Sequence, residues 1–355
     1  MINKEMLDLY SDYLITSFGQ TSCTQMSRML DNKISHDKAT RFLANKNNEY
    51  SSKDFWLLIK SSIRKNETDD GVLIFDDTII NKPHTDMNDI VNYHFDHSKN
   101  VNVRGINILN CYYHNDRISV PISFELVRKD IRFSDIITKK EKRKSSVTKN
   151  QLMRNMIDVA IKNHIRFKYV LTDSWFSSKD NMEYIAKHHN KDFILALKTN
   201  RLVALSKEDK KQGRFRKVSN IDIKDNTAIS VYIKGYDDPV KLVKQIFTNK
   251  DGSIGILYLI SSDLTLDYEQ MTTIYKKRWK VEEYHKSLKQ NAMAEKSPTR
   301  TIVTQNNHFF ASVYAYVKLQ ILNAKTNMNH FALKAKLYVN ALKNAYSELQ
   351  KIKSA

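Results

Sequence analysis

The chain has 355 residues, 41% of them hydrophobic, which is enough to bury a large core and to form two or three domains. Lys and Arg number 58 against 39 Asp and Glu, a formal net charge of +19 that makes nucleic acid the first partner to consider, with a basic surface that only aids solubility as the alternative. Two cysteines are too few for a disulfide framework or a thiolate metal site, and without a long apolar run we expect a soluble, cytoplasmic protein.

The first 68 residues are predicted to be helical, because apolar residues recur there at helical spacing and few β-branched clusters occur. The fourth helix is expected to have Ser52 as its N-cap. The predicted helices lie at 7–18, 24–30, 37–43 and 51–63.

A short polar turn joins the second and third of these helices. This pattern is typical of a helix-turn-helix, in which the helix that carries Lys38 and Arg41 would enter a DNA groove. An ordinary helical bundle fits the same pattern.

Strands and helices alternate after residue 68. The predicted order is three strands, a helix, a strand, a helix and a strand, which indicates an α/β fold with a mixed sheet and crossover helices. A basic run at 139–144 is expected to lead into the first of these helices. Residues 200–265 form alternating segments typical of hairpins, and the pattern is helical again from 267 to the end.

These patterns divide the chain into five expected parts. They are a helical N-terminal DNA-binding domain (1–68), the first part of the core (69–199), a β-rich insertion (200–265), the catalytic helix of the core (266–300) and a C-terminal helical region (301–355).

Two predicted strands end in acidic residues. VLIF is followed by Asp76 and Asp77, whose side chains point to opposite faces of an extended strand, so only one of them points readily into a single site. YVLT is followed by Asp173, at the strand end where open α/β sheets usually bind ligands. The structural alternative is that Asp173 caps the segment after it.

One face of the segment IYKKRWKVEEYHKSLK has a distinctive composition. If the segment is a single helix, Tyr275, Arg278, Glu282 and Lys289 lie on a stripe about 60° wide. The stripe combines an aromatic ring, two cations and a carboxylate. A solvated face with an Arg278–Glu282 pair is the simpler interpretation of this segment by itself.

These four residues also match a known signature. Their spacing is the Y-(2)-R-(3)-E-(6)-K pattern of IS4-type insertion-sequence (DDE) transposases, which the chain resembles in two further segments. FDDT resembles the segment around the first catalytic aspartate of the family and favours Asp76 over Asp77. VLTDSWFSS resembles the segment around the second. The resemblance covers most of the chain and is strongest over 70–290.

The resemblance implies an RNase H-like core with a β-rich insertion between the second aspartate and the glutamate. It also implies that Asp76, Asp173 and Glu282 hold two Mg²⁺ ions, for which Mn²⁺ may substitute, with Asp76 as the bridging ligand. We expect the following residues to contact DNA: Tyr275, Arg278, Lys289, Trp175, Arg41, Lys142 and Arg143.

The expected function is metal-dependent cleavage at transposon ends, followed by 3′-OH attack on target DNA. The partners would be double-stranded DNA with terminal inverted repeats and a second copy of the chain on paired ends, at the nucleoid. A transposase-derived DNA-binding protein without catalysis and a structure-selective RNase H-like nuclease are the alternatives.

Overall fold

A side-chain cap marks the beginning of most helices in the computed structural model, which describes residues 2–96, 99–137, 139–249 and 251–354. Asn3, Ser35, Thr148 and Thr301 each accept a hydrogen bond from a backbone N–H in the first turn of the helix that follows. The helices are α1 Lys4–Thr16, α2 Cys23–Met29, α3 His36–Ala44, α4 Ser52–Asn66, α5 Lys149–Lys162, α6 Lys179–Glu183, α7 Lys207–Lys211, α8 Tyr268–Lys276, α9 Trp279–Gln290, α10 Ile302–Thr326 and α11 His330–Ser354.

The expected N-cap of α4 is wrong by one residue. Ser51 caps the helix, because its hydroxyl accepts from the Asp54 N–H while the Asp54 carboxylate accepts from the Ser51 N–H, which is a reciprocal capping box. The Ser52 hydroxyl instead donates to the Phe124 carbonyl at 2.8 Å and ties α4 to the sheet.

The sheet is the mixed sheet that the sequence predicted. Strand β1 pairs parallel with β7 and antiparallel with β3, and β7 pairs parallel with β8. This is the arrangement of an RNase H-like core, which confirms the expected fold class. The sequence patterns missed β2, which forms the edge beside β3. The core strands are β1 Val72–Asn81, β2 Val91–Asp96, β3 Val101–His114, β4 Ser119–Leu126, β7 Tyr169–Thr172 and β8 Asp192–Leu197.

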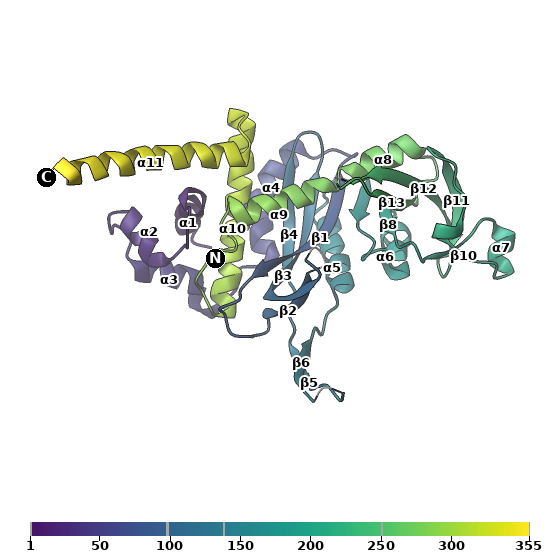
Figure 1. The fold of residues 1–355 in the computed structure, drawn as a ribbon, viewed down its shortest axis with the longest axis horizontal. Coiled ribbons are helices and arrows are strands. Elements are labelled where there is room, and N and C mark those ends of the chain that lie inside the picture. The colour runs from purple at the N-terminus through teal and green to yellow at the C-terminus, as the bar shows by residue number, and fades with distance from the viewer. Residues whose placement is uncertain (1, 97–98, 138, 250, 355) are drawn as a thin grey trace.

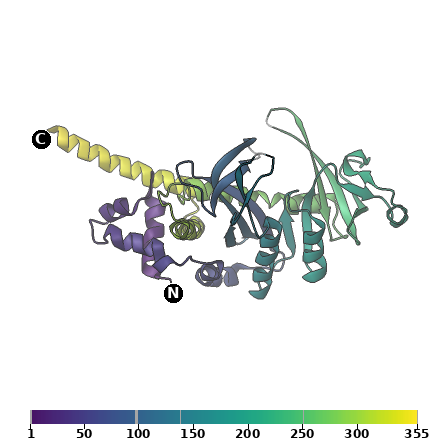
Figure 2. The ribbon, with the colours of Figure 1, turned by 90° about the horizontal axis from the view of Figure 1, so that it is seen from below.

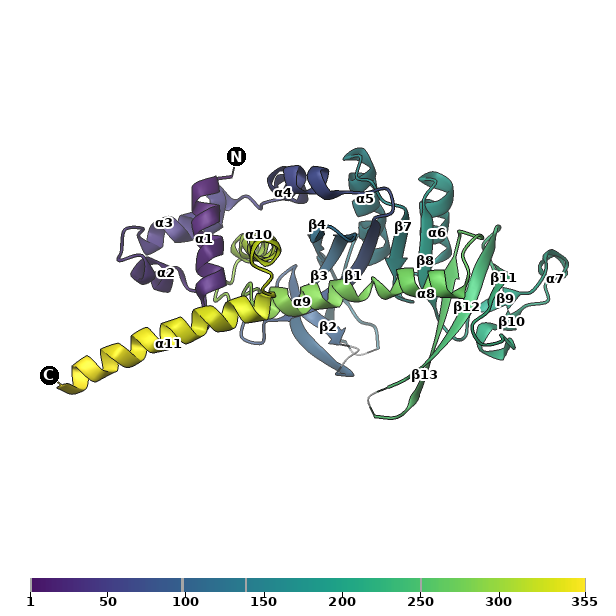
Figure 3. The same ribbon diagram turned by 90° about the horizontal axis from the view of Figure 1, so that it is seen from above.

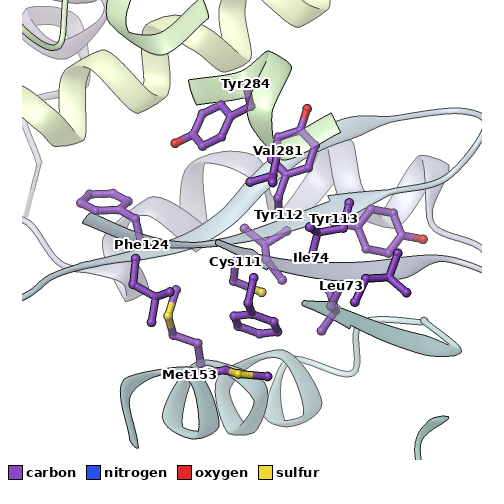
Figure 4. Packing of buried hydrophobic residues seen from close by; sticks show 14 of the residues in the cluster. Leu73, Ile74, Cys111, Tyr112, Tyr113, Phe124, Met153, Val281 and Tyr284 are labelled. Atoms are coloured by element: carbon purple, nitrogen blue, oxygen red, sulfur yellow. The ribbon is translucent and has the colours of Figure 1, made fainter. Parts of the chain in front are cut away.

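Helices cover both faces of the core sheet (Figure 3). Helices α4, α5 and α6 lie on one face, and α8 and α9 run along the other. In the close-up of the core, Ile74 lies on the side of Val281 from α9, whereas Met153 from α5 lies on the opposite side (Figure 4). Side chains alternate along a strand, so Asp76 shares the α9 face with Ile74.

The residues expected to form an insertion continue the same sheet. Strand β13 pairs antiparallel with β8, and β12, β11, β9 and β10 extend the sheet beyond it. The strands are β9 Leu202–Ala204, β10 Arg216–Lys217, β11 Ala228–Ile233, β12 Pro239–Thr248 and β13 Ile254–Ser261.

The basic run at 139–144 is more than a segment that leads into α5. Within it, β6 Glu141–Lys144 pairs with β5 Ile131–Ser134 to form a separate two-stranded hairpin that projects from the body of the molecule (Figure 1). The sequence pattern gave no sign of this pairing, because the lysines of the run are poor strand formers.

The N-terminal helices pack against α10 near the other end of the chain (Figure 2). The buried Asn307 side chain of α10 donates to the carbonyls of Leu43 and Asn48 and accepts from the Tyr50 N–H. Tyr10 and His308 add a buried hydrogen bond of 3.0 Å. This docking fixes 1–68 to the rest of the molecule. None of the described helices combines the length and the apolar character that crossing a membrane requires.

Candidate active site

Asp76 and Asp77 point to opposite faces of β1, as the strand geometry predicted. Asp77 faces α5, where its carboxylate accepts from Lys149 Nζ at 2.8 Å and from the Asn107 side chain. Asp76 faces α9, where its Oδ2 lies 3.8 Å from an Arg278 nitrogen. Asp77 is therefore tied into the structure by its own partners, and Asp76 points toward the helix with the Tyr-Arg-Glu-Lys stripe.

Asp173 follows β7 and lies at the neighbouring strand end. The parallel register pairs Phe75 with Thr172, so the next residues, Asp76 and Asp173, emerge side by side. Asp173 Oδ1 accepts the backbone N–H of Trp175 at 3.0 Å. This contact stabilises the turn after Asp173, whereas Ser178 caps the helix α6 that follows.

The segment with the stripe is two helices and not the single helix that was assumed. Hydrogen bonds from Arg278 N to Tyr275 O and from Val281 N to Arg278 O join residues three apart, which tightens the chain between α8 and α9. Tyr275 and Arg278 of the stripe remain next to each other across this break between the two helices. Tyr275 donates its hydroxyl to the Thr172 carbonyl, next to Asp173, at 3.1 Å, and Arg278 lies over the Tyr275 ring at 5.8 Å.

The Arg278 side chain lies between an acid of strand β1 and an acid of helix α9. Its Nη2 lies 2.7 Å from Glu282 Oε1, and its Nη1 lies 3.8 Å from Asp76 Oδ2. The side chain is largely buried, and its Nε is buried with no hydrogen-bond partner among the described residues. The guanidinium carries a single positive charge between the two carboxyl groups and so compensates their charge only in part.

The sequence analysis missed a buried chain of polar groups behind Asp76. The Tyr284 hydroxyl donates to Asn110 Oδ1 at 3.0 Å, and Asn110 Nδ2 lies 3.0 Å from His285 Nε2. His285 Nδ1 lies 4.0 Å from Asp76 Oδ2. Asn110 pairs with Asp76 in the register of β3 and β1, so a polar residue opposite the acid on a buried strand was the available signal.

Burial dominates the electrostatics of the site. It raises the pKa of Asp76 to about 7, against the opposing effect of Arg278 and with the help of Asp173 and Asp77. Burial also raises the pKa of Asp173. It lowers the pKa of His285 to about 3, so this imidazole is neutral at pH 7. The protein therefore holds two carboxyls whose charge is incompletely compensated.

Two clefts open beside the aspartates. One, with a volume of 990 Å³, is lined by Asp76, Asp173, Trp175 and Lys289 among others. The other, of 710 Å³, shares Asp173 and is lined by Tyr275 and Arg278. Lys289 lies 3.8 Å from Glu295, and Lys149 Nζ lies 4.2 Å from the centre of the Trp175 ring.

The three acids do not form a closed cluster. Across the described parts of the chain, no three His, Cys, Asp or Glu side chains are grouped closely enough to hold a metal ion. Asp76 and Asp173 lie at adjacent strand ends, and Glu282 reaches Asp76 only through Arg278. The residues still fit hard divalent cations, because the donors are all carboxylate oxygens and the raised pKa of both aspartates marks charge that a cation would compensate.

The other residues expected to contact DNA lie away from these clefts. Arg41 is exposed on α3, on the face opposite the buried Ala39 and Phe42. Lys142 pairs with Asp135 at 2.6 Å and remains half-exposed. Arg143 is largely buried and pairs with Asp89 at 2.8 Å, so its side chain anchors the hairpin and is not a free surface cation.

Residues 3–230, more than half of the chain, match the family of DDE superfamily endonucleases. The chain belongs to this family. A search of curated proteins found no relative of the chain. The matched part of the DDE endonuclease includes Asp76 and Asp173, and Glu282 lies beyond it. DDE-type nucleases act on DNA and generally depend on divalent metal ions, in agreement with the all-oxygen donors at the strand ends.

Proposed function

We propose that this DDE endonuclease is a transposase of the IS4 type, which cuts DNA at the ends of an insertion sequence and joins the 3′-OH ends to target DNA. The observation that carries the proposal is the position of Arg278 between Asp76 at the end of β1 and Glu282 on α9. It links an acid of the family-matched region to the Y-(2)-R-(3)-E-(6)-K pattern.

Asp76, Asp173 and Glu282 are the residues that would hold two Mg²⁺ ions. Bound there, the ions supply activation of the attacking oxygen and stabilisation of the charge that grows on the phosphate and the leaving oxygen. For Glu282 to join the two aspartates, its carboxylate has to leave Arg278. Arg278 then offers its guanidinium to a phosphate oxygen of the bound DNA, which it can bind with two hydrogen bonds.

The remaining residues of the site position the DNA. Lys289 lines the same cleft as Asp76 and supplies a positive charge for the DNA backbone. The Tyr275 hydroxyl donates to the Thr172 carbonyl and thereby fixes the backbone that leads into Asp173. Trp175 is 39% exposed and lines the cleft, where the exposed part of its ring face would stack on an unpaired base. The N-terminal domain (1–68), with Arg41, provides contacts outside the cleft.

The direct test compares two neighbouring glutamates on α9. Glu282→Gln is expected to abolish metal-dependent cleavage of DNA that carries the terminal repeats, while DNA affinity changes by less than about threefold. Glu283→Gln is the matched control, because Glu283 is exposed and pairs only with Lys280 among the described residues. Full cleavage by the Glu282→Gln variant would refute the proposal.

A strand-transfer assay separates the alternatives. The proposed transposase yields a joined product from terminal-repeat DNA and a target duplex. A structure-selective nuclease cuts without joining, and a transposase-derived binding protein does neither.

We also propose that the protein acts as a homodimer on paired DNA ends, and α11 offers a surface for this contact. The helix extends away from the body (Figure 1), and seven of its exposed apolar side chains recur at alternating spacings of three and four, as in a coiled coil, while Leu337, Val339 and Tyr346 fall outside this pattern. Dimers in light scattering that Leu342→Gln converts to monomers would support this role, and unchanged dimers would exclude it. The seam consists of Phe331, Ala335, Tyr338, Leu342, Ala345, Leu349 and Ile352.

A further inference from the structure

The β5–β6 hairpin stands apart from the main sheet and ends in two unusually exposed apolar side chains. Ile136 is 95% exposed and Ile137 is 93% exposed, more than any other large hydrophobic residue described. None of the residues that the structure describes covers them. Adjacent, fully exposed isoleucines at the end of a projecting arm indicate a contact with another molecule.

The base of the arm is fixed. Arg143 is largely buried and holds Asp89 at 2.8 Å. On the other side, Ser146 donates its N–H and its hydroxyl to the Asp130 carboxylate at 2.8 and 2.6 Å. Near the tip, Lys142 binds Asp135 across the hairpin at 2.6 Å. The base of the arm is therefore held in a defined position relative to the core.

The arm, which is the β5–β6 hairpin, begins at the edge of the 990 Å³ cleft that is lined by Asp76 and Asp173. The chain that leaves β6 lines this cleft with Ser145, Thr148 and Lys149, on the same wall as Asp77. Lys149 also binds Asp77 at 2.8 Å and so ties the base of the arm to the strand that carries Asp76. A DNA duplex with a phosphate in the cleft would therefore lie close to the base of the arm.

The charge of the hairpin indicates which kind of molecule contacts its tip. Apart from Arg143, which is largely buried at the base, residues 131–144 include five basic side chains, Arg132, Lys139, Lys140, Lys142 and Lys144, against two acidic ones, Asp135 and Glu141. A second copy of the chain carries the same basic arm and a net charge of +19, which opposes self-association through this surface. DNA combines a negatively charged exterior with an apolar interior of stacked bases, and it matches both features of the tip.

We propose that Ile136 and Ile137 form a wedge that inserts between adjacent base pairs of the DNA bound in the cleft, while the lysines beside them contact the phosphates. The wedge unstacks one base step and kinks the duplex next to the site of cleavage, as apolar side chains do in DNA-bending proteins. This proposal rests on the proposed function, because it needs DNA in the cleft.

The test uses the full chain and two duplexes that carry the terminal repeats, one fully paired and one with a small mismatch bubble at the end. Unstacking is already present in the bubble, so the wild-type protein is expected to bind it about tenfold more tightly than the paired duplex. The double variant Ile136→Gln, Ile137→Gln is expected to lose this preference. Leu57→Gln, which changes an exposed leucine on α4, is the control and is expected to keep it.

Permanganate oxidation of thymines gives a second readout. Wild-type protein and the Leu57→Gln control are expected to expose a thymine next to the cleavage site in the paired duplex, and the double variant is expected to leave it protected. If the wild-type protein cleaves DNA but the double variant and the Leu57→Gln control show the same bubble preference and the same thymine oxidation, the wedge is wrong and the proposed function stands. A double variant that loses dimer formation in light scattering and keeps the bubble preference would also overturn it, in favour of a contact between chains. Absence of any cleavage by the wild-type protein would count against the proposed function and, with it, the wedge.

Discussion

Arg278 binds Glu282 one helical turn further along α9, with Nη2 only 2.7 Å from Oε1. The same guanidinium lies 3.8 Å from Asp76 on the neighbouring strand. A single positive charge thus lies between one acid from the sheet and one from the helix. The proposed metal site and this ion pair are alternatives, because both require the Glu282 carboxylate.

Replacement of Arg278 tests this competition. Arg278→Gln is expected to lower the free energy of unfolding without metal by about 2 kcal/mol, toward the low end for a buried pair because Glu282 is partly exposed. Mg²⁺ is expected to restore more stability to the variant than it adds to the wild type. Urea unfolding with and without Mg²⁺ measures both effects. Equal stabilisation of the two proteins by Mg²⁺ would show that Arg278 and the metal do not compete.

The raised pKa of Asp76 predicts an unusual pH dependence. Between the usual value of 3.8 and about 7, the folded protein binds a proton that the unfolded chain has lost. The free energy of unfolding without metal therefore falls as the pH rises through this range. Asp76→Asn removes the buried charge and keeps the shape, so the variant is expected to be more stable than the wild type by about 4 kcal/mol at pH 8 and nearly equal to it at pH 4.

Asp77→Asn is the comparison variant for that experiment. Its carboxylate accepts from Lys149 and Asn107, so Asp77→Asn is expected to destabilise the protein at pH 8 by about 1–2 kcal/mol. Urea unfolding of both variants at the two pH values tests the assignment. A stabilising Asp77→Asn together with a destabilising Asp76→Asn would reverse the roles of the two aspartates.

Asn110 is expected to be essential for the order of the site. It is fully buried and satisfies both the Tyr284 hydroxyl and His285 Nε2, so Asn110→Ala leaves two buried polar groups without a partner. We expect a loss of about 3 kcal/mol in the free energy of unfolding. Asn102→Ala, at an exposed position of the same strand, is the control. If the free energy of unfolding falls by the same amount in both variants, the polar chain behind Asp76 makes no specific contribution to stability.

The N-terminal domain is expected to contribute electrostatic contacts with DNA. If the exposed Arg41 binds a phosphate, Arg41→Gln is expected to reduce the slope of log affinity against log salt by about 0.9. Lys53→Gln, at an exposed position of α4, is expected to leave the slope unchanged. Titration of labelled duplex DNA at several salt concentrations measures the slopes, and equal slopes for Arg41→Gln and the wild type would remove α3 from the DNA interface.

Strand periodicity was sufficient to predict most strands of the core and the opposite orientations of Asp76 and Asp77. The alternation of VLIFDD places Asp76 and Asp77 on opposite faces, and the parallel pairing of β1 with β7 brings Asp173 beside Asp76. Both relationships depend on local geometry and on common sheet topology. They are therefore accessible from a sequence.

The features that the sequence did not reveal depend on contacts between distant segments. The role of Arg143 was missed because its partner, Asp89, lies 54 residues away, and a basic run by itself predicts only a charged surface. In the polar chain, Asn110 lies 174 residues from Tyr284 and 175 residues from His285. The break between α8 and α9 changes hydrogen bonding without a Pro or Gly in that segment, so no residue signals it.

The central claim is that three carboxylates from distant parts of the chain bind two divalent metal ions. Anomalous diffraction from crystals of the protein bound to cleaved DNA ends and Mn²⁺ tests it most directly. We expect two manganese peaks, each within about 2.0–2.3 Å of carboxylate oxygens of Asp76, Asp173 or Glu282, with Arg278 turned to a phosphate. Manganese bound without Glu282, which remains on Arg278 while the DNA is in place, would contradict the claim.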